Sequence, residues 1–271
     1  MIVIYNFYLD ACKAELAKNQ YATTNYTFKK MNIVRRDILR MFTTFIQYAP
    51  LDKPVVNQKI LPHLCDVLKN YKVSPPVLRD AEVILLFAKG LHSLGAVVNE
   101  LIPNILDCIF GGTLELISVD FASNPDHRHN FFVFLKSTVE KCFEALLSIP
   151  AEQLETIINC MVWSIRHQLI SDYEVGLESL LALLSKVNTS LELANQFYVK
   201  YYMRIFNDVL YVLIDKLHEN GFELQMQIMR ILISVLPRVD KGTYDLVRGE
   251  TGPITTRQRE VRPHDDIHPD V

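Results

Sequence analysis

An internal repeat of 41 residues is the feature that most constrains how this chain can fold. The segment VVNQKILPHLCDVL, which starts at Val55, aligns with AVVNELIPNILDCI, which starts at Ala96, so that Pro62 falls on Pro103. A period of about 40 to 47 residues is typical of stacked helix pairs, in which each pair buries its apolar face against the next pair. Proline removes a backbone donor and crowds the preceding turn, so the first helix of each pair should start or bend at the same place.

Apolar residues elsewhere recur at steps of three and four, as in Leu154, Ile157, Ile158, Met161 and Ile165, which trace one face of a helix. No segment requires a strand. The pattern predicts an all-α, HEAT-type solenoid of about five antiparallel helix pairs. The predicted helices cover residues 1–18, 29–49, 55–70, 77–94, 98–118, 128–147, 151–169, 172–187, 194–217 and 221–236.

The composition changes after residue 236. Residues 237–271 contain four prolines, three glycines and only eight apolar residues. A segment with so few apolar side chains cannot bury enough surface to offset the entropy of ordering, which predicts a disordered tail. The sequence therefore predicts a helical-repeat array over residues 1–236 and an unstructured tail over 237–271, with no polar capping helix on the last repeat.

Charge and cysteine usage exclude several classes of protein. The 28 basic residues are outnumbered by 31 acidic ones, so the net charge of -3 gives no general attraction to nucleic acid. No apolar run approaches the roughly 18 residues of a membrane span. The five cysteines are widely separated, and Cys142 and Cys160 lie on apolar helix faces, which favours reduced core thiols over disulfides, a zinc site or a nucleophile.

Two clusters of histidine and aspartate could bind a metal. Asp126, His127 and His129 stand at a helix start, but their spacing does not make them converge as an i, i+4 pair does, so we favour a capped helix start with solvated histidines. Residues 264–268 have helical metal spacing, yet the predicted tail has no core to hold their geometry. We expect no metal site, no cofactor and no catalytic residue.

An enzyme would need polar groups that converge in a pocket, and none can be assembled from this sequence. The pair Gly111-Gly112 lacks the spacing of a phosphate-binding loop, and we interpret it as an interruption of a helix.

Three arginines, Arg35, Arg36 and Arg40, lie in MNIVRRDILRMF, on a predicted second helix of a pair. Second helices line the inner, concave face of a HEAT superhelix, so these arginines are candidates for binding a partner protein. An ordinary solvated helix face is the alternative, because surface charges are common.

With the helices placed, the chain resembles the C-terminal part of the nuclear export receptors of the exportin-one family, within the importin-β (karyopherin) superfamily. The resemblance covers residues 1–236 and is strong because seven motifs occur in the family's order and spacing. The motifs are IVIYNFYLDACKAELAKN, MNIVRRDILRMF, PPVLRDAEVILLFAKGLHSLG, IPNILDCIFGGTLELISVDF, NPDHRHNFFVFLKSTVEKCFEALLSIP, INCMVWSIRHQ and NQFYVKYYMRIFNDVLYVL.

This resemblance implies a partial export receptor that binds Ran in its GTP form on its inner face and moves between nucleus and cytoplasm through nuclear pore proteins. By resemblance, the groove for leucine-rich export signals, its reactive cysteine and most Ran contacts lie in repeats upstream of residue 1. The resemblance also implies that the family continues past residue 236 with further repeats, which the tail does not match. The alternatives are another HEAT scaffold, such as an importin or a phosphatase regulatory subunit, a truncated gene product without function, and, more remotely, a helical hydrolase.

Overall fold

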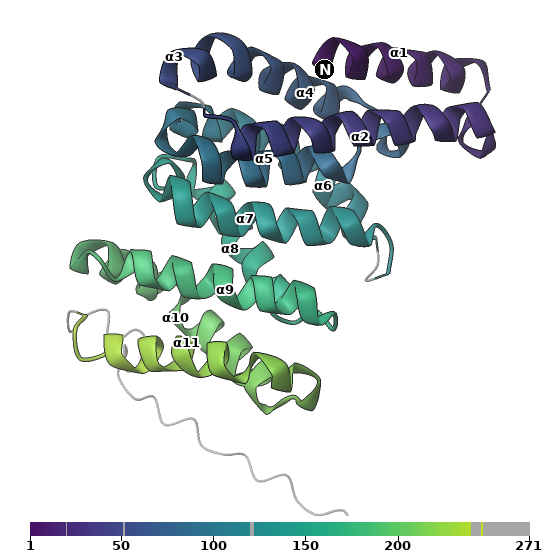
Figure 1. Cartoon of the computed structure of the whole chain (residues 1–271). Helices are drawn as coiled ribbons and strands as arrows, with labels where there is room; N and C mark the ends of the chain where they lie inside the picture. Colours follow the sequence, from purple (N-terminus) through teal and green to yellow (C-terminus); the bar gives the residue numbers. More distant parts are fainter. Residues whose placement is uncertain (20, 51, 120–121, 240–244, 246–271) are drawn as a thin grey trace, which may run out of the picture.

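The computed structural model describes residues 1–19, 21–50, 52–119, 122–239 and 245, and these residues form helices and short connections without a strand. Figure 1 shows the order of the elements along the chain. The long helices are α1 (Ile2–Lys18), α2 (Tyr26–Tyr48), α4 (Leu61–Val73), α5 (Ala81–Leu94), α6 (Ile102–Ile117), α7 (Pro125–Leu146), α8 (Ala151–Ser164), α9 (Ile170–Val187), α10 (Leu191–Ile214) and α11 (Phe222–Val235). The short elements are η1 (Ala22–Thr24), α3 (Lys53–Val55), η2 (Val56–Ile60), η3 (Pro76–Leu78), η4 (Gly95–Leu101) and η5 (Lys216–Gly221).

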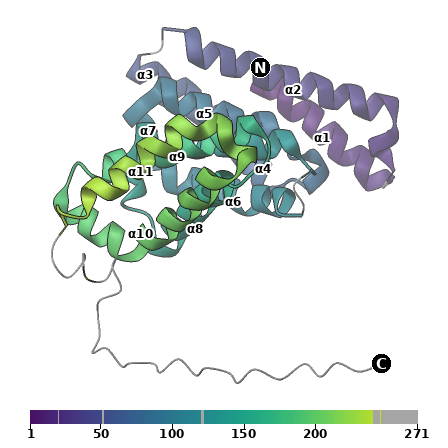
Figure 2. The same cartoon turned by 90° about the horizontal axis from the view of Figure 1, so that it is seen from below.

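The long helices form five consecutive pairs, as the sequence predicts. The pairs are α1/α2, α4/α5, α6/α7, α8/α9 and α10/α11, and we call the members of each pair its first and second helix. Seen along the stack, the first helices form one layer and the second helices another (Figure 2). The prediction of an all-α solenoid is confirmed. Within the described part of the chain, no helix combines the length and the apolar character needed to cross a membrane.

The two layers differ in how closely their neighbours pack. Each second helix packs extensively on the next one, from α2 through α5, α7 and α9 to α11. Among the described residues, α4 and α6 are the only neighbouring first helices with comparable contact. The second helices therefore form the more tightly packed layer, and we take it as the inner face, as expected for second helices of a HEAT-type array.

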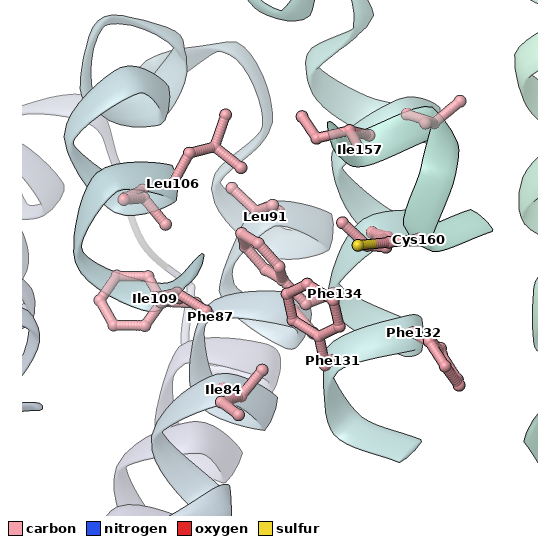
Figure 3. Packing of buried hydrophobic residues seen from close by; sticks show 14 of the residues in the cluster. Ile84, Phe87, Leu91, Leu106, Ile109, Phe131, Phe132, Phe134, Ile157 and Cys160 are labelled. Atoms are coloured by element: carbon pink, nitrogen blue, oxygen red, sulfur yellow. The ribbon is translucent and has the colours of Figure 1, made fainter. Parts of the chain in front are cut away.

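A continuous hydrophobic core runs between the layers, and α7 lies at its centre. Figure 3 shows how its consecutive phenylalanines divide between neighbours: Phe131 and Phe134 lie toward α5 and α6, whereas Phe132 lies on the opposite side. Phe132 packs edge-on against Trp163 of α8, with ring centroids 5.4 Å apart. Burial raises the pKa of the Cys160 thiol to about 12, so this cysteine is a protonated core residue.

The two prolines of the 41-residue repeat occupy equivalent places. Pro62 and Pro103 each lie in the first turn of a first helix, α4 and α6. The missing proline N–H interrupts the regular hydrogen-bond ladder, so a turn of irregular helix precedes each proline. This turn is a π-helix in η2 and a 3-10 helix in η4. The prediction that the two repeat helices start or bend at the same place is confirmed, although α4 and α6 begin at Leu61 and Ile102, later than the predicted starts at 55 and 98.

One local prediction is wrong, and several helix boundaries differ from the predicted ones by up to six residues. Gly111 and Gly112 do not interrupt a helix, since α6 runs through both of them to Ile117. The second helix predicted at residues 29–49 begins earlier, at Tyr26, because the side chain of Asn25 caps it by accepting the backbone N–H of Thr27 at 2.9 Å.

The array continues slightly past the boundary predicted at residue 236. Val239 is buried, and its backbone N–H donates to the carbonyl oxygen of Val235 at 3.1 Å. The remainder of the predicted tail, apart from residue 245, lies outside the described residues, so its disorder stays a prediction.

Candidate functional site

A hollow of about 460 Å³ lies where the middle of α2 faces the first turns of α5, α7 and α9. We call it the inner cleft. It brings together two groups of residues that the sequence analysis treated separately, the arginines at 35–40 and the cluster at 126–129. Its lining is strongly charged, and includes Arg36, Arg40, Asp80, Glu82, Asp126 and Asp172.

Arg35 is part of the interior, with a relative exposure of only 1%. Its Nη1 donates to Oδ1 of Asn32 at 2.7 Å, and its Nη2 donates to the carbonyl oxygen of Leu78 at 2.9 Å. The guanidinium also lies over the ring of Tyr5, 5.4 Å from its centroid. Arg35 therefore joins α1, α2 and the turn before α5. We had expected it to stand at the surface beside the other two arginines, and it does not.

Arg36 and Arg40 lie on the exposed rim of the cleft and reach across to the start of α5. Nε of Arg36 lies 3.6 Å from Oδ2 of Asp80. Nε of Arg40 donates to Oε1 of Glu82 at 2.7 Å, and this hydrogen bond raises the pKa of Arg40. These two arginines are the members of the predicted set that a partner can reach.

The turn before α5 forms the floor of the cleft and is held by side chains of α7. Nε2 of His127 lies 2.8 Å from the carbonyl oxygen of Arg79, and Nδ2 of Asn130 donates to the carbonyl oxygen of Ala81 at 2.9 Å. Burial lowers the pKa of His127, although the hydrogen bond to the carbonyl opposes this. Since a carbonyl oxygen only accepts, His127 donates from Nε2, and it is not the solvated histidine that the sequence suggested.

His129 contacts a different partner from His127, so the two histidines of the candidate metal site point to different places. Its Nδ1 lies 2.9 Å from Oδ1 of Asp172, a buried residue in the first turn of α9. Oδ2 of Asp172 lies 3.6 Å from Nδ1 of the buried His167, whose pKa is lowered chiefly by desolvation. In the described ranges, no group of three or more His, Cys, Asp or Glu side chains is arranged to hold a metal ion. The second predicted cluster, residues 264–268, lies outside the described residues.

Arg79 closes the far side of the cleft and explains the glycine pair of α6. Its Nη1 donates to Oε2 of Glu115 at 2.6 Å and to the carbonyl oxygen of Gly112 at 3.1 Å. A Cβ at Gly112 would lie 3.0 Å from two guanidinium atoms of Arg79. Gly112 therefore makes room for an arginine that crosses between repeats.

Three acidic residues of the cleft, Asp80, Glu82 and Asp172, were not among the predicted site residues. Asp80 accepts the backbone N–H of Glu82 at 3.0 Å and so caps α5. Its position directly before the apolar run AEVILLFA is a recognisable cap signal. Asp172 had no such signal, because its partners come from distant segments.

Comparison with known proteins places the chain in one family. A family model described as CRM1 C terminal matches residues 1–261, a match that extends past the boundary predicted at residue 236. Exportin-1 of Schizosaccharomyces pombe is 36% identical over 79% of this chain and 20% of its own length. Protein EXPORTIN 1B of Arabidopsis thaliana is 31% identical, over 87% of this chain and 22% of its own length. Exportin-1 of Dictyostelium discoideum is 30% identical, with the same two coverages.

The chain thus spans about a fifth of the length of the curated relatives that it matches. The family match covers nearly all of the chain, and it agrees with the stacked helix pairs of the structure. This chain belongs to the CRM1 C-terminal family.

Proposed function

We propose that this chain is the C-terminal arm of a nuclear export receptor that binds Ran in its GTP form and carries leucine-rich-signal cargo from the nucleus to the cytoplasm. Family membership and the exportin-1 relatives support this role. As in the resemblance, cargo would bind through repeats that precede residue 1, and shuttling would involve nuclear pore proteins. The role is that of a transport receptor and not of an enzyme.

The inner cleft is the observation that carries a direct role for this arm in binding Ran. It is a charged hollow on the inner face, and Arg36 and Arg40 stand on its rim with side-chain exposures of 45% and 57%. Such half-exposed charges contribute to the rate and specificity of association, and salt screens them. Arg35 supports this surface from beneath.

The affinity of the isolated arm for Ran should be low. If a ring-like receptor holds one ligand with two ends, each end raises the effective concentration of the ligand at the other. Removal of one end should therefore weaken the affinity by a factor on the order of 10² or more. We therefore expect binding that is micromolar or weaker, that prefers the GTP form, and that weakens as salt is added.

Isothermal titration calorimetry of the full chain with Ran tests the proposal. Ran should be loaded either with a non-hydrolysable GTP analogue or with GDP, and titrated at two salt concentrations. The double substitution Arg36→Glu and Arg40→Glu should abolish measurable binding. Arg35 is not a suitable test position, because its replacement would disturb the fold.

Two results would contradict the proposal. Binding that is tight and indifferent to both salt and the two substitutions would place the interface elsewhere on the chain. Equal binding of the GTP and GDP forms would instead favour the alternative of a general HEAT-repeat scaffold.

A further inference from the structure

Two arginine–carboxylate ion pairs and one histidine–aspartate contact in the inner cleft share one orientation. In each, the base comes from one second helix and the carboxylate from the first turn of the next, and the base is the exposed partner. The side-chain exposures are 45% for Arg36 against 6% for Asp80, 57% for Arg40 against 13% for Glu82, and 40% for His129 against 1% for Asp172. A partner that approaches these three contacts therefore meets the basic side chains before their carboxylates. Two other carboxylates are exposed nearby: Asp126 on the α7 side, and Asp37, whose Oδ1 lies 3.5 Å from Nη1 of Arg40.

The carboxylates are also fixed in place. Asp80 caps α5 through the backbone N–H of Glu82, and Asp172 is held between His129 and the buried His167. The arginines, by contrast, have long side chains that can turn toward a partner without leaving the rim. Arg36 is the arginine held most weakly by neighbouring side chains, because its only ion pair among the described residues is the 3.6 Å contact between its Nε and Oδ2 of Asp80.

We propose that the inner cleft binds an acidic segment of a partner protein, whose carboxylates pair with the guanidinium groups of Arg36 and Arg40. This inference deepens the proposed function, because it assigns a charge to the segment that the cleft would contact. A guanidinium presents parallel N–H donors that match a carboxylate, and such charge-assisted pairs are among the stronger hydrogen bonds in proteins.

The structure favours an acidic peptide over nucleic acid as the occupant. Affinity for nucleic acid rises with the number of phosphates that are neutralised, and the cleft offers two exposed arginines on a chain of net charge -3. Asp126, which is exposed on the α7 side of the cleft, further limits the positive field. A short acidic segment needs to contact only the two arginines, whereas an extended polyanion would require more basic groups than the rim offers.

Replacement of Asp126 should change the affinity for an acidic ligand in the opposite direction from replacement of the arginines. Its carboxylate should repel an acidic ligand, so Asp126→Asn should strengthen binding, whereas charge reversal at Arg36 and Arg40 should weaken it. Lys29 and Lys30 provide a matched control, since they are exposed on the same helix but do not line the cleft. Their double replacement by glutamate changes the net charge by the same amount as Arg36→Glu with Arg40→Glu.

The experiment measures fluorescence anisotropy of a labelled hexaglutamate peptide titrated with the full chain at low and physiological salt. We expect weak, salt-sensitive binding that falls by on the order of tenfold or more in the Arg36→Glu/Arg40→Glu variant. We expect a change of less than about threefold in the Lys29→Glu/Lys30→Glu control, and tighter binding in Asp126→Asn. Far-UV circular dichroism verifies the fold, and Arg36→Gln/Arg40→Gln replaces the reversal variant if that variant misfolds.

Three results would overturn the inference: no binding of hexaglutamate, equal loss in the arginine and lysine variants, or a single-stranded oligonucleotide that binds more tightly at the same arginines. These outcomes are separable from the Ran titration. Arginine-dependent Ran binding that hexaglutamate does not inhibit would refute the acidic-segment proposal alone. Arginine-dependent hexaglutamate binding together with equal binding of the GTP and GDP forms of Ran would refute the proposed function alone.

Discussion

Replacement of Arg35 by methionine should destabilise the N-terminal repeat far more than the same replacement of its neighbour Arg36. Methionine keeps a long, flexible side chain at position 35 but has no donor for Oδ1 of Asn32 or for the carbonyl oxygen of Leu78, which accept hydrogen bonds at 2.7 and 2.9 Å. Arg36 is half exposed, and its ion pair spans 3.6 Å.

The magnitude follows from these contacts. Each buried acceptor left without its donor costs about 1–3 kcal/mol, and loss of the contact with Tyr5 adds about 0.5–2 kcal/mol. Burial of the Arg35 guanidinium, which pairs with no carboxylate among the described residues, itself costs solvation energy, so its removal offsets part of this loss. We therefore expect Arg35→Met to lower the free energy of unfolding by about 2–4 kcal/mol, and Arg36→Met to lower it by about 0–1 kcal/mol.

Urea denaturation followed by circular dichroism, together with amide hydrogen exchange, measures this difference. Stability in a solenoid depends on nearest neighbours, so Arg35→Met should first release α1 and α2 while α9 to α11 keep their protection. If the two variants unfold at the same urea concentration, or if exchange increases evenly along the chain, the role assigned to Arg35 is wrong.

Four further predictions concern the whole chain. Gly176→Ala should lower the free energy of unfolding by about 1–3 kcal/mol, because the new Cβ would lie 2.9 Å from Cβ of Ser164. Gly90→Ala should raise it by about 0.5–1 kcal/mol in the same urea titration, because the new Cβ meets nothing within 4 Å. Burial raises the thiol pKa of Cys142 from 9.0 to about 11 and that of Cys160 to about 12. Because the thiols ionise at lower pH in the unfolded chain, the free energy of unfolding should be constant below pH 9 and then fall toward pH 12, by about 1.4 kcal/mol per pH unit for each thiol between its unfolded and folded pKa. A urea midpoint that does not change over this range would contradict the burial of these thiols. Far-UV circular dichroism should not change with a chelator, and a loss of helix on metal removal would reverse our interpretation of the histidine clusters. The chain alone should not bind a leucine-rich export peptide in an anisotropy assay, and saturable binding that is lost when the leucines become alanines would show that the groove lies here.

The helix pairs could be predicted because apolar spacing and the repeated prolines are local signals. The burial of Arg35 also left a signal that we did not use. Arg35 stands seven residues after Phe28 and seven before Phe42, both of which are buried, so it lies on the core face of α2. Arg36 and Arg40 lie outside that stripe. A helical projection would have separated Arg35 from the other two.

The acidic half of the inner cleft could not be predicted in the same way. Asp172 is buried because His129 and His167 reach it from two other helical segments, and no spacing within one segment reveals such a contact. The glycine pair of α6 was misread for a similar reason. Glycine in isolation suggests a helix break, whereas here Gly112 accommodates the guanidinium of Arg79, which is distant in sequence.

The unequal packing of the two layers determines how the array can deform. The second helices form a continuous row of buried contacts, so this layer acts as the neutral axis of bending. The first helices α8 and α10 are also linked by polar side chains, through Lys200 with Glu155 and Arg204 with Asn159, and Arg166, just after the end of α8, pairs with Asp208 of α10. Exposed bridges of this kind contribute little energy. Small rotations at the α8/α10 junction should therefore widen or narrow the outer layer there at little energetic cost, while the buried contacts between the second helices are kept.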